Sequence, residues 1–363
     1  MNESTTGRSG VTILGSANLD TVFTVDRIPS PGETILAESA KRYPGGKGLN
    51  QAVAAARAGA PTCFIGAVGT DDAGDVLAAT MADARIDSSS VRRETAPTGQ
   101  AFIVVDRSGE NTIIVASGAN SCVTALAPAD AEMLSRSGVL LMQLELPLAV
   151  VAEAAATARA SGCVVMLNAA PARTLEAGLV ACLDVLIVNE HEACLVGQAD
   201  NLTEASAALA ALVPRLIVTL GSAGSALYEN GREIARIAAP QVTAIDATGA
   251  GDTFCGAFAA AIAEGQQFEP AARFATAAAA LSVQVIGAVP SVPMRNRIDA
   301  ALSAAARIDA TRIDTTRIDA TRIDAAQARP AVQSTAVQSP AVQSPAVQSP
   351  AVQSPAEQDR RIP

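Results

Sequence analysis

Short apolar runs alternate with longer alanine-rich segments through the middle of the chain, and this alternation limits the fold more than any other feature of the sequence. The apolar runs predict strands at residues 63–68, 139–144, 163–168, 185–188 and 216–220. The segments between them predict helices at residues 75–84, 148–160, 173–181 and 204–212. Strand, helix and strand in succession form a parallel sheet. We therefore expect an α/β fold class, with a doubly wound, mostly parallel central sheet and helices on both faces.

A second group of strands is predicted outside this sheet. Polar and apolar residues alternate over residues 20–43, on either side of a Pro-Ser-Pro-Gly turn. Residues 98–105 and 111–116 are also rich in β-branched side chains, and the polar run between them is typical of a hairpin. These stretches predict a small β-sheet lid formed by about residues 20–43 and 98–117.

Residues 246–254 join a glycine turn to an apolar, alanine-rich helix. Gly249 and Gly251 remove side chains where the backbone must come close to another group. The N–H groups at the start of the helix, that of Ala250 among them, favour a phosphate or a developing oxyanion. Asp252 could take a proton from a hydroxyl group that attacks phosphorus. The stretch alone leaves a second interpretation open, in which Asp252 only caps the helix.

A second glycine loop leads into a helix at residues 44–60. Its spacing does not match a Walker loop, which needs GxxxxGK followed by Ser or Thr. Gly45, Gly46 and Gly48 permit close approach of the backbone, and Asn50 would project from the first turn toward the loop. A plain helix start explains one glycine, but it does not explain three glycines followed by Asn.

Polar side chains follow several of the predicted strands. Asn18 and Asp20 come after an apolar run at residues 11–15, and together they offer an amide and a carboxylate to a pair of sugar hydroxyls. Turn formation is the alternative for both residues. The ends of further predicted strands carry Gln143 and Glu145, Asn168, residues 189–192, and residues 219–224. Because ligands bind beyond the carboxyl ends of such strands, we expect these side chains to share one site.

Glu192 lies three residues after Asn189 and could hold Mg²⁺ through water, because Mg²⁺ keeps part of its hydration shell. A carboxylate that caps the following helix is the alternative. His191 is the one histidine of the chain, and we assign it no role.

Charge and cysteine content exclude several classes of function. The formal net charge of −10 argues against a surface that binds nucleic acid, so an anionic substrate would need local cations or Mg²⁺. The six cysteines are scattered without a CxxC pair, which favours reduced thiols in a cytoplasmic protein. We find no apolar run of about 18 residues and no signal-like start, so we expect neither a membrane span nor secretion.

Five motifs stand in one order along the chain and resemble those of the PfkB-type family of sugar and nucleoside kinases. They are Asn18-Leu19-Asp20, Gly45-Gly46-Lys47-Gly48-Leu49-Asn50-Gln51-Ala52, Asn189-Glu190-His191-Glu192, Thr219-Leu220-Gly221-Ser222 and Gly249-Ala250-Gly251-Asp252. The resemblance runs from about Thr12 to about Leu302. It is specific, because several separate motifs agree in identity and spacing.

The resemblance implies ATP-dependent phosphorylation of the 5-hydroxyl of D-ribose, the first step of ribose catabolism. It implies that Asp252 is the catalytic base and that Gly249, Ala250 and Gly251 form the anion hole. The positions that match the sugar site are Asn18, Asp20, Gly46, Lys47, Gly48, Asn50, Glu145 and Asp252. Those that match the nucleotide site are Asn189, Thr219, Leu220, Gly221, Ser222, Ala223, Gly224, Gly251 and Thr276. A kinase of deoxyribose, fructose or adenosine and a non-catalytic sugar-binding sensor are the alternatives.

By the same resemblance, Glu192 belongs to the motif that tunes Mg²⁺, and a loop beside the anion hole would bind a monovalent cation such as K⁺. The positions that match this loop are Asp246, Thr248, Ser282, Val285, Gly287 and Ser291. Ordinary turn chemistry is the alternative for all six. One departure is that Val285 and Ile286 stand where some members carry basic residues. The family also pairs its lids to form homodimers.

The last part of the chain is repetitive. A final helix is predicted at residues 294–306, which closes a kinase domain of residues 11–306. Arg-Ile-Asp then recurs every five residues, a period that places no continuous apolar stripe on a helix. Ala-Val-Gln-Ser-Pro units follow, and their prolines exclude helix and inner strand. We expect residues 307–363 to be a disordered low-complexity tail.

Overall fold

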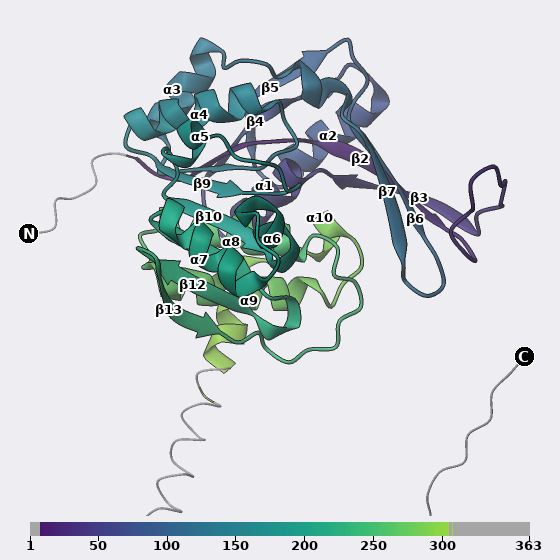
Figure 1. Ribbon diagram of the computed structural model, residues 1–363. Coiled ribbons are helices and arrows are strands. Elements are labelled where there is room, and N and C mark those ends of the chain that lie inside the picture. Colours follow the sequence, from purple (N-terminus) through teal and green to yellow (C-terminus); the bar gives the residue numbers. More distant parts are fainter. Residues whose placement is uncertain (1–7, 305–306, 308–363) are drawn as a thin grey trace, which may run out of the picture. The chain divides into compact units, whose positions relative to one another are not determined.

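The computed structural model describes residues 8–304 and Arg307, and its centre is a nine-stranded sheet (Figure 1). The strand order is β13-β12-β11-β10-β9-β8-β1-β4-β5. The strands are β1 (Val11–Leu14), β4 (Thr62–Gly69), β5 (Asp87–Glu94), β8 (Val139–Met142), β9 (Val164–Asn168), β10 (Val185–Asn189), β11 (Arg215–Thr219), β12 (Ser225–Glu229) and β13 (Arg232–Ile237). All pairs from β11 to β5 are parallel, whereas β12 and β13 form an antiparallel edge. The predicted mostly parallel sheet is confirmed.

Helices cover both faces of the sheet, and each face has its own hydrophobic core. On one face lie α1 (Lys47–Arg57), α2 (Asp72–Asp83), α8 (Ala250–Ala263), α9 (Phe268–Ser282), the short α10 (Ala288–Ser291) and a last helix at 295–304. On the other lie α3 (Pro128–Arg136), α4 (Leu148–Ala160), α5 (Ala177–Val180), α6 (Glu190–Gly197) and α7 (Leu202–Leu212). Short 3₁₀ turns follow the lid and β11, at η1 (Gly118–Cys122) and η2 (Gly221–Ala223).

Small residues let the helices of the first face approach closely. A Cβ atom on Gly256 of α8 would lie 2.3 Å from the carbonyl oxygen of Gln51 and 2.5 Å from Cβ of Ala54, both on α1. Glycine is therefore required there, because a larger side chain would push the two helices apart. The alanine-rich core thus holds α1 and α8 at close range, and both helices begin at the glycine loops that the sequence singles out.

The chain changes direction across the sheet at β1, which lies between β4 and β8. From β1 the chain adds β4 and β5 on one side and then returns to β8 and proceeds outward to β11. In a doubly wound sheet a ligand site forms at such a switch point, beyond the carboxyl ends of the strands. The loops after β1 and β8 therefore mark where the site should lie.

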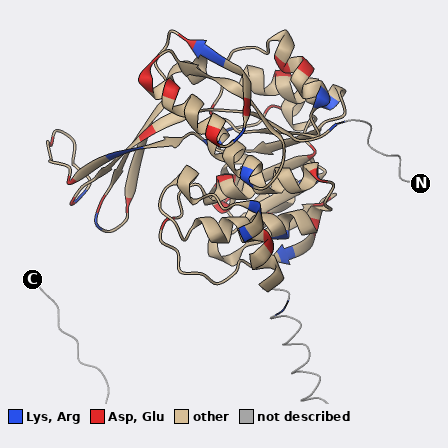
Figure 2. Ribbon diagram, turned by 180° about the vertical axis from the view of Figure 1, so that it is seen from behind, with Lys and Arg blue, Asp and Glu red and all other residues tan. Residues whose placement is uncertain are grey.

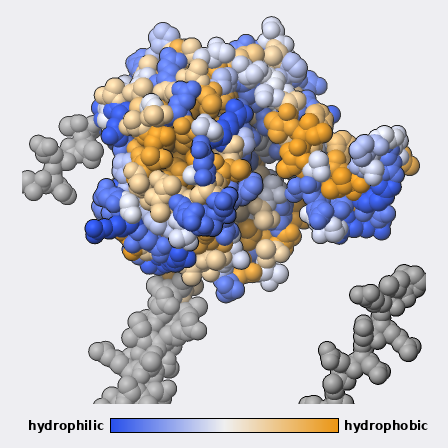
Figure 3. All heavy atoms as spheres, viewed as in Figure 1, coloured by the Kyte–Doolittle hydropathy of each residue, from blue (hydrophilic) through white to orange (hydrophobic). Residues whose placement is uncertain are grey.

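A separate four-stranded sheet projects from the body, with the order β3-β2-β6-β7 (Figure 1). Its strands are β2 (Asn18–Thr24), β3 (Ser39–Gly45), β6 (Gln100–Val105) and β7 (Asn111–Ala116). Strands β2 and β6 pair in parallel and the other pairs are antiparallel. Strand β2 starts at Asn18, where it pairs with Gly45, so the lid grows directly out of the predicted sugar motifs. Hydrophobic residues gather on the projecting sheet (Figure 3).

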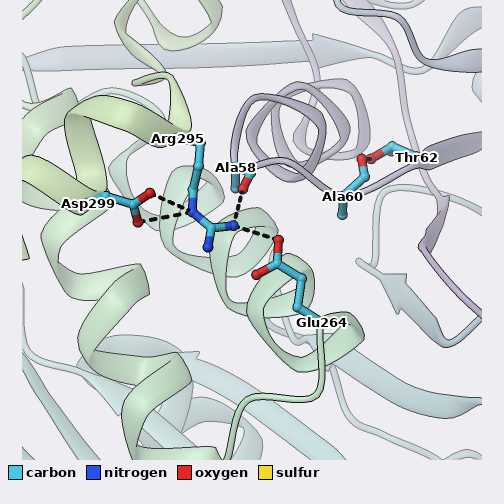
Figure 4. A network of polar contacts seen from close by, with 6 residues as sticks. All are labelled: Ala58, Ala60, Thr62, Glu264, Arg295 and Asp299. Atoms are coloured by element: carbon cyan, nitrogen blue, oxygen red, sulfur yellow. Dashed lines mark hydrogen bonds and ion pairs between the residues drawn. The ribbon is translucent and has the colours of Figure 1, made fainter. Parts of the chain in front are cut away.

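The last helix is tied to the ends of α1 and α8 by one arginine (Figure 4). Arg295 donates from Nη1 to the carbonyl oxygen of Ala58 at 3.0 Å and pairs with Glu264. Its Nε donates to Asp299 at 3.0 Å, and the guanidinium lies 4.9 Å from the ring centre of Phe274. These contacts fix the helix to the body that carries the site. The predicted tail at residues 307–363 lies outside the described residues, except for Arg307.

Lys and Arg are interspersed with Asp and Glu over the described part of the chain (Figure 2). Many form exposed ion pairs, such as Arg136 with Glu132 and Arg236 with Glu233. Pairs of this kind contribute about 0–1 kcal/mol each. Among the described residues, no helix has both the length and the apolar content that crossing a membrane would need.

Candidate active site

The start of α8 leaves backbone N–H groups free. Gly249 precedes the helix in the left-handed region with φ 74°, and no side chain caps the helix. The amide of Ala250 donates to the carbonyl oxygen of Ala247 at 3.2 Å, whereas the amides of Gly251 and Asp252 have no acceptor in the described part of the chain. Free amides at a helix N-terminus favour an anion. The expected anion hole therefore depends on Gly251 and Asp252 more than on Ala250, whose amide closes the preceding turn.

The two glycines of this turn have different tasks. A Cβ atom on Gly249 would lie 2.8 Å from Cβ of Ala288, and the positive φ would strain any other residue there. A Cβ atom on Gly251 would meet no atom within 4 Å. Gly249 is thus required by packing, whereas Gly251 faces open space through which a ligand can reach the backbone.

Asp252 does not cap its own helix. Its Oδ1 accepts from Nε2 of Gln51 and its Oδ2 from Nδ2 of Asn50, both at 2.9 Å. Both donors stand near the start of α1, and Asp252 is 7% exposed. The carboxylate is directed across the switch point toward α1, which fits a chemical role better than capping. Gln51 was not predicted, because its contact with Asp252 depends on the packing of two distant helices.

The three glycines of the α1 loop are each explained by close approach. A Cβ atom on Gly45 would lie 2.0 Å from Oδ2 of Asp20, and one on Gly48 would lie 2.6 Å from the backbone of Ser16. Gly46 precedes α1 with φ 85°. The loop therefore packs its backbone against the loop after β1, as its three glycines indicated.

Other predicted sugar residues surround this loop. Asn18 is 3% exposed, and its Oδ1 accepts from Nδ2 of Asn120 at 2.8 Å. Glu145 accepts from the hydroxyl group of Ser16 and from the amide of Lys47, the latter at 3.1 Å. Asn120 and Ser16 were not predicted, since their contacts join segments that lie about 100 residues or more apart in the sequence.

Two buried acceptors in this group have no hydrogen-bond partner in the described part of the chain. They are Oδ1 of Asp20 and Oδ1 of Asn50. A buried acceptor without a donor is costly, by about 1–3 kcal/mol. Hydroxyl groups of a bound polyol would supply the missing donors. This pair of acceptors is therefore the feature of the site that fits a sugar best.

Carboxylates outnumber ammonium groups at this point: Asp20 lies near the charges of Glu145 and Asp252, and Lys47 lies near those of Asp252, Glu145 and Glu192. Burial, followed by the charges of Glu145 and Asp252, raises the pKa of Asp20 to about 7. The charge of Asp252, followed by that of Glu145, raises the pKa of Lys47 despite its burial. Since the carboxylates outnumber the cation, the site holds excess negative charge, and Asp20 is the group that takes up a proton near neutral pH.

Two connected cavities meet at the start of α8. The smaller has a volume of about 210 Å³, and Lys47, Glu192 and Asp252 line it. The larger has a volume of about 450 Å³. Asn189, Thr219 and Gly251 line both. Asp20 opens onto a further cavity of about 280 Å³ beneath lid strands β2 and β3. A small substrate in the smaller cavity would therefore place a hydroxyl group near the carboxylate of Asp252, with a larger molecule bound in the adjacent cavity.

Most of the predicted nucleotide residues line the larger cavity. They are Asn189, Thr219, Gly221, Ser222, Gly224, Gly251 and Thr276. Leu220 and Ala223 belong to the same turn but do not line the cavity. The opposite wall was not predicted and is apolar, with Val242, Phe254 and Val283. Residues 239–244 follow no regular period, so their contribution to this wall could not be predicted.

The Asn189 motif is a capping box that also faces the smaller cavity. Oδ1 of Asn189 accepts from the amide of Glu192 at 2.8 Å, and Oε2 of Glu192 accepts from the amide of Asn189 at 2.9 Å. Burial raises the pKa of Glu192. No group of three His, Cys, Asp or Glu side chains gathers into a metal cage among the described residues. The residues present therefore fit Mg²⁺ that is held largely by phosphate and water, with Oε1 of Glu192 left to contact that water.

The predicted cation residues lie in two segments that one carboxylate joins, the loop before α8 and the stretch from the end of α9 to the end of α10. Oδ1 of Asp246 accepts from the amide of Thr248, and Oδ2 accepts from the amide of Gly287, both at 2.8 Å. Burial alone would raise the pKa of Asp246, but these hydrogen bonds hold it below its ordinary value. The hydroxyl groups of Ser282 and Ser291 donate within their own turns. Val285 lies in the second of these segments, so the structure brings all six residues to adjacent turns.

Comparisons with known proteins agree with this architecture. Residues 8–295 match the model of the pfkB family carbohydrate kinases. A curated relative, the ribokinase of Haemophilus influenzae, is 40% identical over 296 residues, which cover 79% of this chain and 96% of the relative. The chain therefore belongs to the pfkB family of carbohydrate kinases, and the resemblance inferred from its motifs is confirmed.

Solved structures extend the same comparison. The structure of Arabidopsis thaliana ribokinase complexed with ribose and ATP has a TM-score of 0.76 and 34% identity, and the match covers 81% of this chain and 99% of that one. The ribokinase of Thermotoga maritima also has a TM-score of 0.76, with 35% identity and the same coverage of both chains. Both similarities extend over the central sheet and the lid together, since nearly the whole of each relative is matched.

The titration of Asp20 predicts how sugar affinity depends on pH. Burial and the charges of Glu145 and Asp252 raise its pKa, and a hydrogen bond from the backbone of Ala101 opposes them. Sugar hydroxyls donate best to the ionised carboxylate, so the affinity for a sugar should fall as the pH drops through about 7. The dissociation constant, measured by calorimetry, should rise at most about tenfold per pH unit. The Asp20→Asn variant should lose this slope, and an unchanged slope in that variant would contradict the assignment.

Proposed function

We propose that this protein transfers the γ-phosphoryl group of ATP to the 5-hydroxyl of D-ribose, which gives D-ribose 5-phosphate and ADP. The observation that carries this proposal is the buried carboxylate of Asp252, which is held by α1 at the meeting point of two cavities and next to free amides. Relatives that are 40% and 37% identical are ribokinases, and one related structure contains ribose and ATP. Membership of the carbohydrate kinase family supports the same reaction type.

The arrangement performs the reaction by positioning and charge stabilisation. Asp252 takes the proton of the attacking hydroxyl group as its oxygen bonds to the γ-phosphorus and the bond to ADP breaks. The amides of Gly251 and Asp252 stabilise the charge on the transferred group. Asn18, Asp20, Asn50, Lys47 and Glu145 hold the sugar, together with the backbone of Gly46 and Gly48. Mg²⁺, when it is bound with ATP, neutralises phosphate charge, and Glu192 contacts it through water.

A substrate panel tests the proposal against its alternatives. ADP release should be measured with D-ribose, deoxyribose, fructose and adenosine at saturating Mg·ATP. We expect D-ribose to give the highest kcat/KM. If another compound gives the highest kcat/KM, the protein is a related kinase with that compound as its substrate. If none of them stimulates turnover, it is a sugar-binding sensor.

The Asp252→Asn variant tests the role of the carboxylate. The amide cannot accept the proton, so kcat should fall by about 10³-fold or more, whereas the dissociation constant of D-ribose should change little. Glu233→Gln, an exposed substitution on β13, is the matched control and should retain full turnover. Comparable turnover by Asp252→Asn and the wild type would rule out Asp252 as the base.

We also propose that K⁺ binds in the loops joined by Asp246 and orders the start of α8. The proposal is supported by the two hydrogen bonds of Asp246, which join the loop before α8 to the loop after α9. In this account K⁺ raises kcat relative to tetramethylammonium, and Asp246→Ala removes that response. Asp106→Asn changes a carboxylate with similar turn contacts in the lid hairpin and should keep the response. If K⁺ raises kcat of Asp246→Ala as much as it raises kcat of the wild type, this proposal is wrong.

The lid is the proposed homodimer contact. Strand β7 lies at the edge of its sheet, and Ile113, Ile114 and Val115 on it are 53%, 65% and 49% exposed. An exposed apolar edge strand invites pairing with a second chain. Light scattering after size exclusion should give a dimer mass for the wild type and a monomer mass for Ile114→Lys. Val76→Lys replaces an exposed apolar residue on α2 and should leave the dimer intact, so loss of the dimer in both variants would contradict the assignment.

We further propose that residues 11–306 form the kinase domain, with its lid at about residues 20–43 and 98–117, and that residues 307–363 form a tail outside it. The family match over residues 8–295 supports this boundary. The six cysteines carry free thiols, which supports a cytoplasmic location for the reaction.

A further inference from the structure

A buried amide stands behind the carboxylate of Asp252, and the motifs assign it no task. Gln51 is fully buried on α1 and donates from Nε2 to Oδ1 of Asp252 at 2.9 Å. The same group lies 3.1 Å from Oδ1 of Asn168. Its own Oε1 accepts from Nε2 of Gln143 at 2.6 Å. Gln143, which is 1% exposed at the end of β8, thus reaches the carboxylate through Gln51.

The carboxylate sets the direction of this chain of hydrogen bonds. An ionised carboxylate can only accept, so Gln51 must present its NH₂ group to Asp252. The Gln51 oxygen then faces Gln143, which must in turn present its own NH₂ group. Oε1 of Gln143 is left without a partner in the described part of the chain. Oε1 of Gln143 is unpaired because the carboxylate of Asp252 fixes the donor and acceptor directions of both glutamine side chains.

The surrounding packing holds both amides in place. A Cβ atom on Gly15 would lie 2.2 Å from Oε1 of Gln143, so glycine is needed there to admit the side chain. A Cβ atom on Gly256 would lie 2.3 Å from the carbonyl oxygen of Gln51, so the backbone of α1 cannot move away from α8 without opening a gap. Gly15 and Gly256 therefore make room for the hydrogen-bonded side chains of Gln143 and Gln51, called the relay below.

The geometry clamps the carboxylate at both oxygens. Asn50 binds Oδ2 and Gln51 binds Oδ1, so rotation of the carboxylate plane would break at least one hydrogen bond. Each oxygen has about two acceptor sites, which leaves one on each for an incoming hydroxyl group. Asn50 belongs to the predicted sugar site, and its Oδ1 has no partner in the described part of the chain, whereas both polar atoms of the Gln51 side chain bond to other side chains of the protein.

We propose that Gln51, oriented by Gln143, is a positioning residue that holds the Asp252 carboxylate in line for proton transfer. The inference rests on the proposed role of Asp252 as the base. Because both polar atoms of the Gln51 side chain bond to protein side chains, its loss should alter kcat and leave substrate affinity nearly unchanged. A misplacement of about 1 Å at a reacting group costs about 100-fold in rate, which sets the scale of the effect.

Three variants test the relay by steady-state kinetics with the best sugar of the substrate panel. Gln51→Met keeps the side-chain length and removes the donor, so kcat should fall about 10- to 100-fold while KM for sugar and for ATP stays within about twofold. Gln143→Met should also lower kcat, although it makes no hydrogen bond to Asp252. The double variant should be no worse than Gln51→Met alone, because both substitutions break one chain.

Independent, multiplicative losses in the double variant, or full kcat in Gln51→Met, would overturn the inference. A rise in both KM values with unchanged kcat would do the same, since that result belongs to a binding or purely structural role. Gln266→Met, a half-buried glutamine after α8, is the matched control and should retain wild-type kinetics. Should Gln51→Met fail to fold, as judged by thermal melting, Gln143→Met decides alone: unchanged kcat refutes the relay. A wild-type protein without sugar kinase activity would instead refute the proposed function.

Discussion

The site depends on one buried negative charge that its own helix does not neutralise. Asp252 stands in the first turn of α8, yet its carboxylate is held by two amide groups from α1. The backbone amides at the start of α8 therefore stay free for an anion, while the carboxylate is available to a proton donor. The glycines and alanines between α1 and α8 let the two helices pack closely. This packing allows α1 to hold the carboxylate while the amides of α8 bind the anion.

This arrangement also explains why lid and body meet where they do. Strand β2 of the lid starts at Asn18, and the α1 loop packs against Asp20 and the turn after β1. Among the described residues, Oδ1 of Asp20 in the lid and Oδ1 of Asn50 in α1 are buried acceptors without a hydrogen-bond partner. A polyol that binds there would contact both parts at once and would satisfy both acceptors. Substrate binding and the seating of the lid are therefore expected to be coupled.

Much of this organisation could be predicted from residue patterns. The helix at residues 148–160 was predicted at its observed bounds, because the run is rich in alanine, a strong helix former, and Pro147 marks its start. The antiparallel edge formed by β12 and β13 was not predicted, since these strands have only five and six residues and mix polar with apolar side chains. Motif residues such as Asp252 were recognised by local spacing. Gln51, Asn120 and the apolar wall of the larger cavity were not, because their roles arise from contacts between distant segments.

The most direct measurement is a crystal structure of the protein with D-ribose and a non-hydrolysable ATP analogue. The account predicts that an oxygen of Asp252 lies about 2.6–3.2 Å from the 5-hydroxyl, with the terminal phosphate at the amides of Gly251 and Asp252. A structure in which both ligands are bound and Asp252 contacts neither of them would contradict it.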